Sequence, residues 1–167
     1  MPPRQGFAYN KDRIYISLGL ITLNIIIPLS NGLSKGFNSV LIIWCAISVL
    51  FFLWFFFRFG YAAITGKYAI ELTSEAIDNN IIRKTIPWNE VGKLNVLSGE
   101  ASHILVVHLT TLDNHKPRNL IRVIIRNLVI KKYGSPIIIN TKVLNVTAPF
   151  LLSEMLVFKE RYDMLKG

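Results

Sequence analysis

Two long apolar runs near the N-terminus constrain the fold of this chain more than any other feature. The first extends from Ile14 to Leu33 and the second from Phe37 to Phe57, and neither contains a charged residue. An apolar helix of about 20 residues is long enough to cross the hydrocarbon core of a bilayer. A short polar turn with one lysine, Lys35, separates the runs. The sequence therefore predicts a hairpin of two transmembrane helices.

The basic residues that flank the runs predict the orientation of the hairpin. The turn carries one basic residue, whereas the outer flanks carry Arg4, Lys11, Arg13, Arg58 and Lys67. Lys and Arg are enriched in cytoplasmic loops. We therefore expect a multi-pass protein of the inner (plasma) membrane with both termini in the cytoplasm. A cleaved signal peptide is not expected, because a second apolar run follows the first at once.

The end of the second run has the composition of an interfacial anchor. Trp and Tyr concentrate at the membrane–water interface, and an Arg side chain can extend along apolar surface to reach the headgroups. We expect Trp54, Arg58 and Tyr61 to hold the hairpin at that level. Ala62 to Lys67 is then expected to be a short connector.

Polar groups inside the runs are few. Asn24 is expected to bond across to the second helix near Cys45 or Ser48, because an amide in lipid needs a partner. Pro28 is expected to kink or end the first helix. Cys45 is the one cysteine, so the chain has no internal disulfide, and we interpret it as a small apolar side chain.

After residue 65 the pattern changes, so we divide the chain into residues 1–65, a lead-in with the two spans, and residues 66–167, an α+β domain. Residues 1–12 are expected to be frayed or to lie on the headgroups. Short stretches with an apolar alternation of two predict consecutive strands of an antiparallel meander. These stretches are Tyr68–Leu72, Ala76–Asp78, Ile81–Ile86, Lys93–Leu97, His103–Leu109 and Ile137–Ile139. Trp88, between two of them, is expected to lie in the core.

A closing helix is predicted from Ala148 to Leu165. Thr147 is a suitable cap and Pro149 fits the first turn. Apolar residues recur at helical spacing and predict a stripe that packs on the sheet. The stripe consists of Leu151, Met155, Phe158, Tyr162 and Leu165.

The segment from Arg118 to Tyr133 is predicted to be a helix, with a pair of strands as the alternative because it is rich in β-branched residues. It contains the positive excess of the domain: from Lys67 onward 14 Lys and Arg stand against 9 Asp and Glu, and six of the basic residues lie in or just before this segment with no acidic one. They are Lys116, Arg118, Arg122, Arg126, Lys131 and Lys132.

Three interpretations of this basic segment remain open. A helix would place Arg118, Arg122 and Arg126 in one row that could lie along an anionic leaflet. The first alternative is a core helix with a solvated basic edge, and the second is a helix that binds a protein partner. Nucleic acid is not expected, because the segment has no aromatic groups on which bases could stack.

The sequence offers no support for catalysis. His103 and His108 are predicted on opposite faces of one strand, and His115 lies in the following loop, so the histidines cannot converge on a metal. No serine or cysteine is arranged as a nucleophile, and no glycine-rich loop opens a helix. We therefore predict a non-enzymatic protein without metal or cofactor.

The layout of the whole chain resembles small bacterial inner-membrane proteins with a pleckstrin-homology-like cytoplasmic domain. The resemblance depends on the hairpin, the meander containing Ile86–Val91, the segment Gly134–Ile139 and the closing helix. It implies a bent antiparallel sheet closed at one end by the last helix. Such a sheet has seven strands, whereas the sequence shows five or six, so Arg118–Tyr133 would be an insertion or a distorted replacement.

The resemblance does not extend to a lipid-binding loop. The phosphoinositide-binding basic loop of the eukaryotic domains is not matched here, because Glu75 and Asp78 stand between the first strands. The leading hypothesis is a membrane protein whose cytoplasmic domain binds lipid or another membrane protein. The alternatives are an immunity protein that neutralises a toxin from competing bacteria at the inner membrane, and an accessory subunit of a membrane enzyme or transporter. An enzymatic role would require titratable groups such as Glu90, Glu100 and His103 to converge in a cleft.

Overall fold

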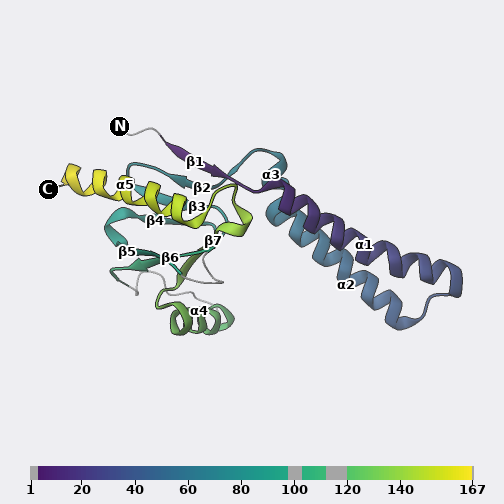
Figure 1. Ribbon diagram of the computed structural model, residues 1–167. Helices are drawn as coiled ribbons and strands as arrows, with labels where there is room; N and C mark the ends of the chain where they lie inside the picture. Colours follow the sequence, from purple (N-terminus) through teal and green to yellow (C-terminus); the bar gives the residue numbers. More distant parts are fainter. Residues whose placement is uncertain (1–3, 98–102, 112–119, 167) are drawn as a thin grey trace. The chain divides into compact units, whose positions relative to one another are not determined.

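The computed structural model describes residues 4–97, 103–111 and 120–166, apart from the side chains of Leu120 and Arg122. The chain divides into two compact units. The hairpin unit comprises Ala8–Tyr68, and the β-rich unit comprises Met1–Phe7 together with Ala69–Gly167. Figure 1 labels the helices and strands of both.

The hairpin unit consists of two long helices that pack against each other. Helix α1 spans Lys11–Lys35 and α2 spans Ser39–Phe55. Each begins at an asparagine cap: Asn10 Oδ1 accepts from the Arg13 N–H at 3.1 Å, and Asn38 Oδ1 accepts from the Leu41 N–H at 2.8 Å. By length and composition, α1 and the continuous helical stretch Ser39–Ile64 that begins with α2 are each able to cross a membrane. The predicted helical hairpin is therefore present.

The prediction for Asn24 in α1 is wrong, and so is one of the two outcomes expected at Pro28, the end of the helix. Asn24 Nδ2 donates to the Leu20 carbonyl of its own helix at 2.9 Å and not to α2, since an amide can reach back one turn without a partner helix. Pro28 lies inside α1 and does not end it, because the helix continues to Lys35. The turn comes instead at Gly36, whose φ of +91° favours glycine.

The second helix extends beyond the predicted run. A π-helical turn, Phe56–Gly60, follows α2 and leads directly into α3, Tyr61–Ile64. No glycine or proline with a breaking conformation intervenes before Gly66, whose φ is +69°. The connector expected at Ala62–Lys67 therefore shortens to residues 65–67. At the π turn a Cβ on Gly60 would lie 3.3 Å from Leu18 Cδ1, so glycine permits close approach of the two helices.

The described residues of the β-rich unit form two sheets, and not the single bent sheet, closed at one end by the last helix, that was expected. The first has the order β1-β2-β3-β4 and the second the order β5-β6-β7. The strands are β1 Gln5–Ala8, β2 Tyr68–Leu72, β3 Ala76–Asn79, β4 Lys84–Pro87, β5 Val91–Val96, β6 Ile104–Leu109 and β7 Ile137–Asn140. The pairs β2–β3, β3–β4, β5–β6 and β6–β7 are antiparallel, as predicted. The register places Ile77 opposite Ile86 and Leu105 opposite Ile139, and all four side chains are buried.

Strand β1 corrects, for residues 5–8, the expectation that residues 1–12 are frayed or lie on headgroups; residues 1–3 are outside the described residues. It forms the edge of the first sheet beside β2. Phe7 is buried and packs edge-to-face on Phe150, and Arg4 lies 3.7 Å from the Glu71 carboxylate. Because α1, α2 and α3 follow β1 and precede β2, the hairpin is inserted between the first two strands of one sheet.

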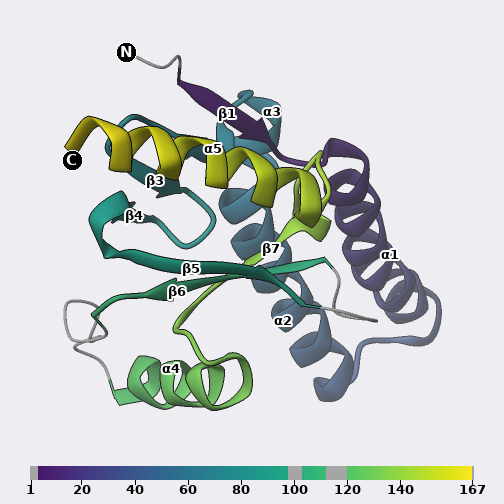
Figure 2. The same cartoon turned by 60° about the vertical axis from the view of Figure 1, so that its left-hand side comes forward.

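Helix α5, Ala148–Lys166, packs against β5 and β6. Leu151, Met155 and Phe158 are buried, whereas Leu165 is 73% exposed, so the predicted stripe ends before the last turn. Trp88, in the single turn between β4 and β5, is fully buried as expected and stacks on Phe158 with centroids 6.4 Å apart. In Figure 2, α5 and α4 lie on opposite sides of β5 and β6, as they do in Figure 1.

Candidate functional site

Helix α4, Leu120–Tyr133, is the most unusual element of the β-rich unit. It settles the choice between helix and strands for residues 120–133, which are helical, so the strand alternative is wrong there. No side chain of α4 among those that the structure describes is buried. An apolar face on an ordinary core helix would be covered, so α4 differs from that interpretation.

The exposed side of α4 is apolar. We use the name outer stripe for Ile121, Ile124, Ile125 and Leu128, which are 66%, 52%, 55% and 62% exposed. Their spacing of three, one and three places them on one face of a helix. Four large aliphatic side chains thus stand together in solvent, an arrangement that marks an interaction surface more often than a free one.

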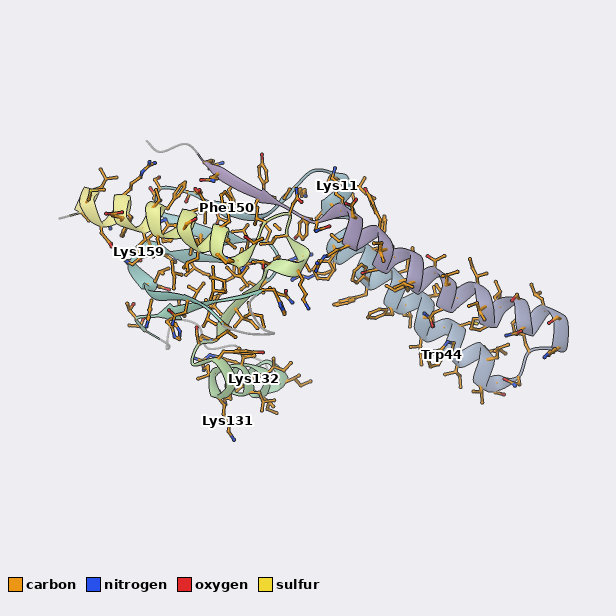
Figure 3. The ribbon with its side chains drawn as sticks, viewed as in Figure 1. Lys11, Trp44, Lys131, Lys132, Phe150 and Lys159 are labelled. Atoms are coloured by element: carbon orange, nitrogen blue, oxygen red, sulfur yellow. The ribbon has the colours of Figure 1, made fainter. Side chains whose placement is uncertain are left out.

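Two lysines adjoin the outer stripe at the end of the helix. Lys131 and Lys132 lie in the last turn, and both are exposed. Figure 3 shows the labelled Lys131 side chain extending away from the sheets. Cations are favoured at a helix C-terminus because the last carbonyl groups carry partial negative charge. The surface formed by the outer stripe, Lys131 and Lys132 is therefore apolar along its length and positive at one end.

Arg126 lies on the other side of α4. At 100° per residue it projects well away from the outer stripe, and it is half-buried. Its charge acts on Lys84, whose pKa is lowered below 10.5 by burial and further by Arg126, while Glu90 opposes the shift. Arg126 therefore faces the domain beside β4 and not the surface that carries Lys131 and Lys132.

The remaining predicted basic residues fall outside what the structure describes. Lys116 and Arg118 lie in residues 112–119, and the side chain of Arg122 is likewise outside the described residues. Three arginines were expected in one row along the helix, and Arg126 is the one whose side chain the structure describes.

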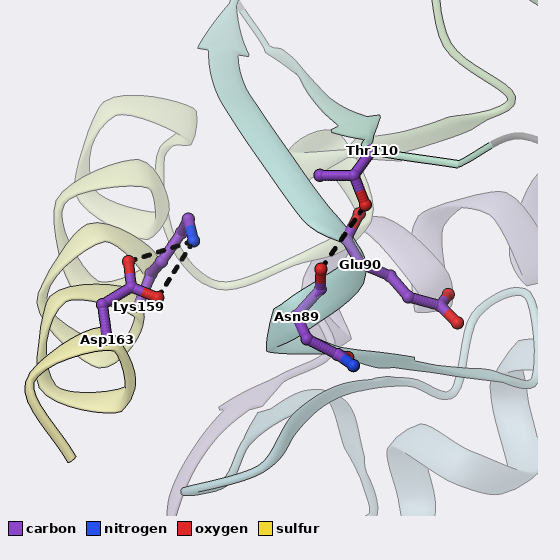
Figure 4. Close-up of polar contacts among 5 residues, drawn as sticks. All are labelled: Asn89, Glu90, Thr110, Lys159 and Asp163. Carbon is purple, nitrogen blue, oxygen red and sulfur yellow. Dashed lines mark hydrogen bonds and ion pairs between the residues drawn. The ribbon is translucent and has the colours of Figure 1, made fainter. Parts of the chain in front are cut away.

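The backbone near Glu90 is held by the end of β6. The Thr110 N–H donates to the Glu90 carbonyl at 2.9 Å, and Thr110 Oγ1 lies 3.3 Å and 3.4 Å from the carbonyls of Glu90 and Asn89. Figure 4 shows these contacts. They fix the start of β5 and with it the Glu90 side chain that lies near Lys84.

The predicted interfacial anchors all lie near the end of the second helix of the hairpin unit. Trp54 is 57% and Tyr61 49% exposed. The Arg58 guanidinium lies 5.9 Å from the centroid of the Phe59 ring, and Lys67 Nζ lies 5.6 Å from that of Tyr61. Aromatic rings paired with cations near the end of an apolar helix are typical of a membrane interface.

Of the titratable groups named for an enzymatic role, Glu90 and His103 belong to the described part of the chain, whereas Glu100, like His115, falls outside it. The charge of Glu90 acts on Lys84. Among the described residues no group of three or more His, Cys, Asp or Glu could hold a metal ion. An open groove of about 520 Å³ follows α5, and its Lys159 is paired with Asp163 at 3.1 Å (Figure 4).

Comparison with protein-family models, with curated proteins and with solved structures finds no match for the chain. The candidate site therefore depends on the geometry of α4 alone. The sequence predicted the basic residues of this segment and left open whether its apolar side covers a core or meets a leaflet. The outer stripe was not singled out, although the spacing of the isoleucines carried the signal, because amphipathic spacing does not show what covers an apolar face.

Proposed function

We propose that this chain is an integral membrane protein whose hairpin crosses the inner membrane twice and whose β-rich unit is a cytoplasmic interaction module without catalytic activity. One observation carries the first part of the proposal. In the most apolar window of each long helix only 6% and 0% of the residues are buried inside the protein. A helical pair that leaves so much aliphatic and aromatic surface uncovered is stable in lipid and not in water.

The hairpin is inserted between two strands of one sheet, and this supports placing both ends of the hairpin on the same side of the membrane. Strand β1 precedes α1, β2 follows α3, and the two strands are neighbours in one sheet. Both flanks must then lie on one side of any membrane that the hairpin crosses. The positive charge on the flanks favours the cytoplasmic side.

The strand count supports the pleckstrin-homology-like assignment as part of this proposal. The described residues form seven strands in sheets of four and three, followed by the helix α5 that packs on β5 and β6. The sequence had revealed five or six strands because β1 was missed. The hairpin occupies the connection between the first and second strands, and α4 occupies the connection before the last.

Labelling of single cysteines in cells tests the topology. In a Cys45→Ser background, Ser34→Cys at the hairpin turn should react with a membrane-impermeant maleimide added outside. Ser153→Cys on α5 should react only after the membrane is made permeable. Both positions are exposed in the protein, so accessibility to the reagent reports the side of the membrane. Labelling of Ser153→Cys in intact cells, or release of the protein by alkaline carbonate, would contradict the proposal.

A further inference from the structure

We propose that α4 is an in-plane amphipathic helix that docks on the anionic leaflet of the membrane. Its outer stripe would insert at the level of the headgroups, and Lys131 and Lys132 would lie near the lipid phosphates. This inference rests on the proposed function, because it requires the hairpin to hold the β-rich unit beside a bilayer. It identifies the lipid surface as the ligand of the interaction module and α4 as the element that binds it.

The exposure of α4 is the first argument. The side of α4 that faces the domain carries Arg126, and the side that faces away carries three isoleucines and a leucine, each more than half exposed. A helix in water places such residues the other way round. A helix that lies in a membrane interface has this distribution, with its apolar side in the acyl boundary and its polar side outward.

Charge selects the ligand. Six basic and no acidic residues lie between positions 116 and 132, and the two of them with exposed, described side chains adjoin the outer stripe. Anionic lipids attract such segments. A second copy of the chain that packed its α4 parallel to this one is disfavoured as the ligand, because the parallel pair would bring Lys131 and Lys132 near their own counterparts.

Helix α5 shows that an exposed apolar surface does not by itself suit an anionic leaflet. Helix α5 also exposes apolar residues, including Leu156 and Met164, but acidic groups stand among them. Glu160 and Asp163 line the same groove, and Asp163 is paired with Lys159. An anionic leaflet would repel these carboxylates. Of these two helices, α4 is the one whose described side chains join an uncovered apolar face to exposed basic residues and no acidic ones.

The connections in the chain strengthen a weak docking contact. Only residues 65–67 separate α3 from β2, and only two residues separate β1 from α1. A module attached at two points by such short links experiences a high effective concentration of the surface that its anchor occupies. Two lysines and a short apolar stripe would bind vesicles weakly from solution, whereas the same groups on a tethered module would be docked for much of the time.

Spin labels on the full-length protein test the contact directly. The protein would be reconstituted in the Cys45→Ser background into vesicles of phosphatidylcholine alone or mixed with phosphatidylglycerol. Leu128→Cys on the outer stripe and Leu50→Cys in α2 would each carry one label. Collision with dissolved oxygen and with a water-soluble nickel complex reports whether a label lies in lipid. We expect Leu128→Cys to gain oxygen contact and lose nickel contact in the anionic vesicles only.

The two positions separate failure of this inference from failure of the proposed function. Leu50→Cys should contact oxygen in both kinds of vesicle if the hairpin spans the bilayer. Exposure of that label to nickel would overturn the proposed function and this inference with it. Oxygen contact at Leu50→Cys with a water-exposed Leu128→Cys label in anionic vesicles would overturn this inference alone. Dipolar broadening between Leu128→Cys labels without oxygen contact would assign the outer stripe to a second copy and overturn the lipid assignment.

A charge-matched pair of variants tests the role of the lysines. Lys131→Gln with Lys132→Gln should lower the ratio of docked to undocked α4 by about 30-fold in anionic vesicles, since two basic contacts with the surface are lost. Lys93→Gln with Lys142→Gln removes the same charge from exposed positions on β5 and after β7 and should leave the ratio unchanged. Equal losses in the two variants, or equal docking of the unmodified protein in the two lipids, would overturn the assignment of an anionic surface.

Discussion

Helices α4 and α5 belong to the same unit and have opposite surroundings. The apolar residues Leu151, Met155 and Phe158 of α5 are covered by the sheets and by Trp88. The apolar residues of α4 form the outer stripe and point away from its half-buried Arg126. Apolar periodicity therefore identifies a face of a helix, but it does not identify what covers that face. A core and a docking surface have the same pattern when only the sequence is considered.

The largest expected effect comes from the same substitution on the two helices. Leu151→Ala should lower the free energy of unfolding by about 2–5 kcal/mol, because Leu151 is fully buried and its truncation leaves a cavity. Leu128→Ala on the outer stripe should change it by less than about 0.5 kcal/mol. Urea titration of the full-length protein in mild detergent, read by pulse proteolysis of the β-rich unit, measures both. Similar losses in the two variants would mean that α4 is a core helix after all.

Trp88 tests how much the packing of α5 on the sheets depends on its aromatic partner. Trp88→Phe removes the indole that stacks on Phe158 and donates from Nε1 to the Thr73 carbonyl at 2.9 Å. We expect the free energy of unfolding of the β-rich unit to fall by about 2 kcal/mol, because the core loses volume and the Thr73 carbonyl loses its donor. Trp44→Phe on the exposed surface of α2 is the matched control and should leave the unfolding of the β-rich unit unchanged. An unchanged midpoint for Trp88→Phe would show that burial of Trp88 adds little to the docking of α5.

Ser135 tests how the chain leaves α4 and enters the sheet. Its Oγ is buried, donates to the Val107 carbonyl and accepts from the Ile137 N–H at 3.2 Å. Ser135→Ala should cost about 1–2 kcal/mol, because a buried carbonyl and a buried N–H lose their partner. Ser153→Ala removes an exposed hydroxyl bonded to the Phe150 carbonyl within α5 and should cost much less. An equal fall in the free energy of unfolding for the two variants would show that the buried hydroxyl of Ser135 does not fix the segment between α4 and β7.

The parts of the fold that local chemistry decides were predictable from the sequence. Alternating apolar residues located six of the strands, and the two apolar runs located the long helices. The stretch predicted as a strand at Ile81–Ile86 corresponds to β4, which begins only at Lys84, because the residues before it form a turn. Asn79 Oδ1 accepts from the Ile82 N–H at 3.2 Å, and Arg83 has a φ of +54°. A polar asparagine pair signalled that turn, but the left-handed arginine had no sequence signal.

The parts that depend on distant partners could not be predicted. Strand β1 has four residues including Gly6, and its place beside β2 depends on a pairing across the whole hairpin. At the π turn Phe56–Gly60, Gly60 lies close to Leu18 of the first helix. The exposure of the outer stripe follows from where α4 lies relative to β5 and β6. Each of these is a long-range contact, which no local propensity encodes.

The smallest expected effect concerns the inward side of α4, and it tests the orientation on which the comparison depends. Burial lowers the pKa of Lys84 below 10.5, and the positive charge of Arg126 lowers it further. Arg126→Gln should therefore raise the pKa of Lys84, and Glu90→Gln should lower it, whereas Lys131→Gln on the outer side should leave it unchanged. Titration of the Lys84 side chain by NMR, assigned by its loss in Lys84→Arg, measures all three.

The same shift determines the pH dependence of stability. Between the lowered pKa of folded Lys84 and 10.5, the unfolded chain binds more protons than the folded one, so stability should rise with pH across that window. Arg126→Gln raises the pKa of Lys84 in the folded protein and so moves the lower limit of this pH window upward. The gain in stability across the window should therefore be smaller than in the unmodified protein. A Lys84 pKa that does not respond to Arg126→Gln would place Arg126 away from β4, and α4 would then be rotated with the outer stripe no longer facing away from the domain.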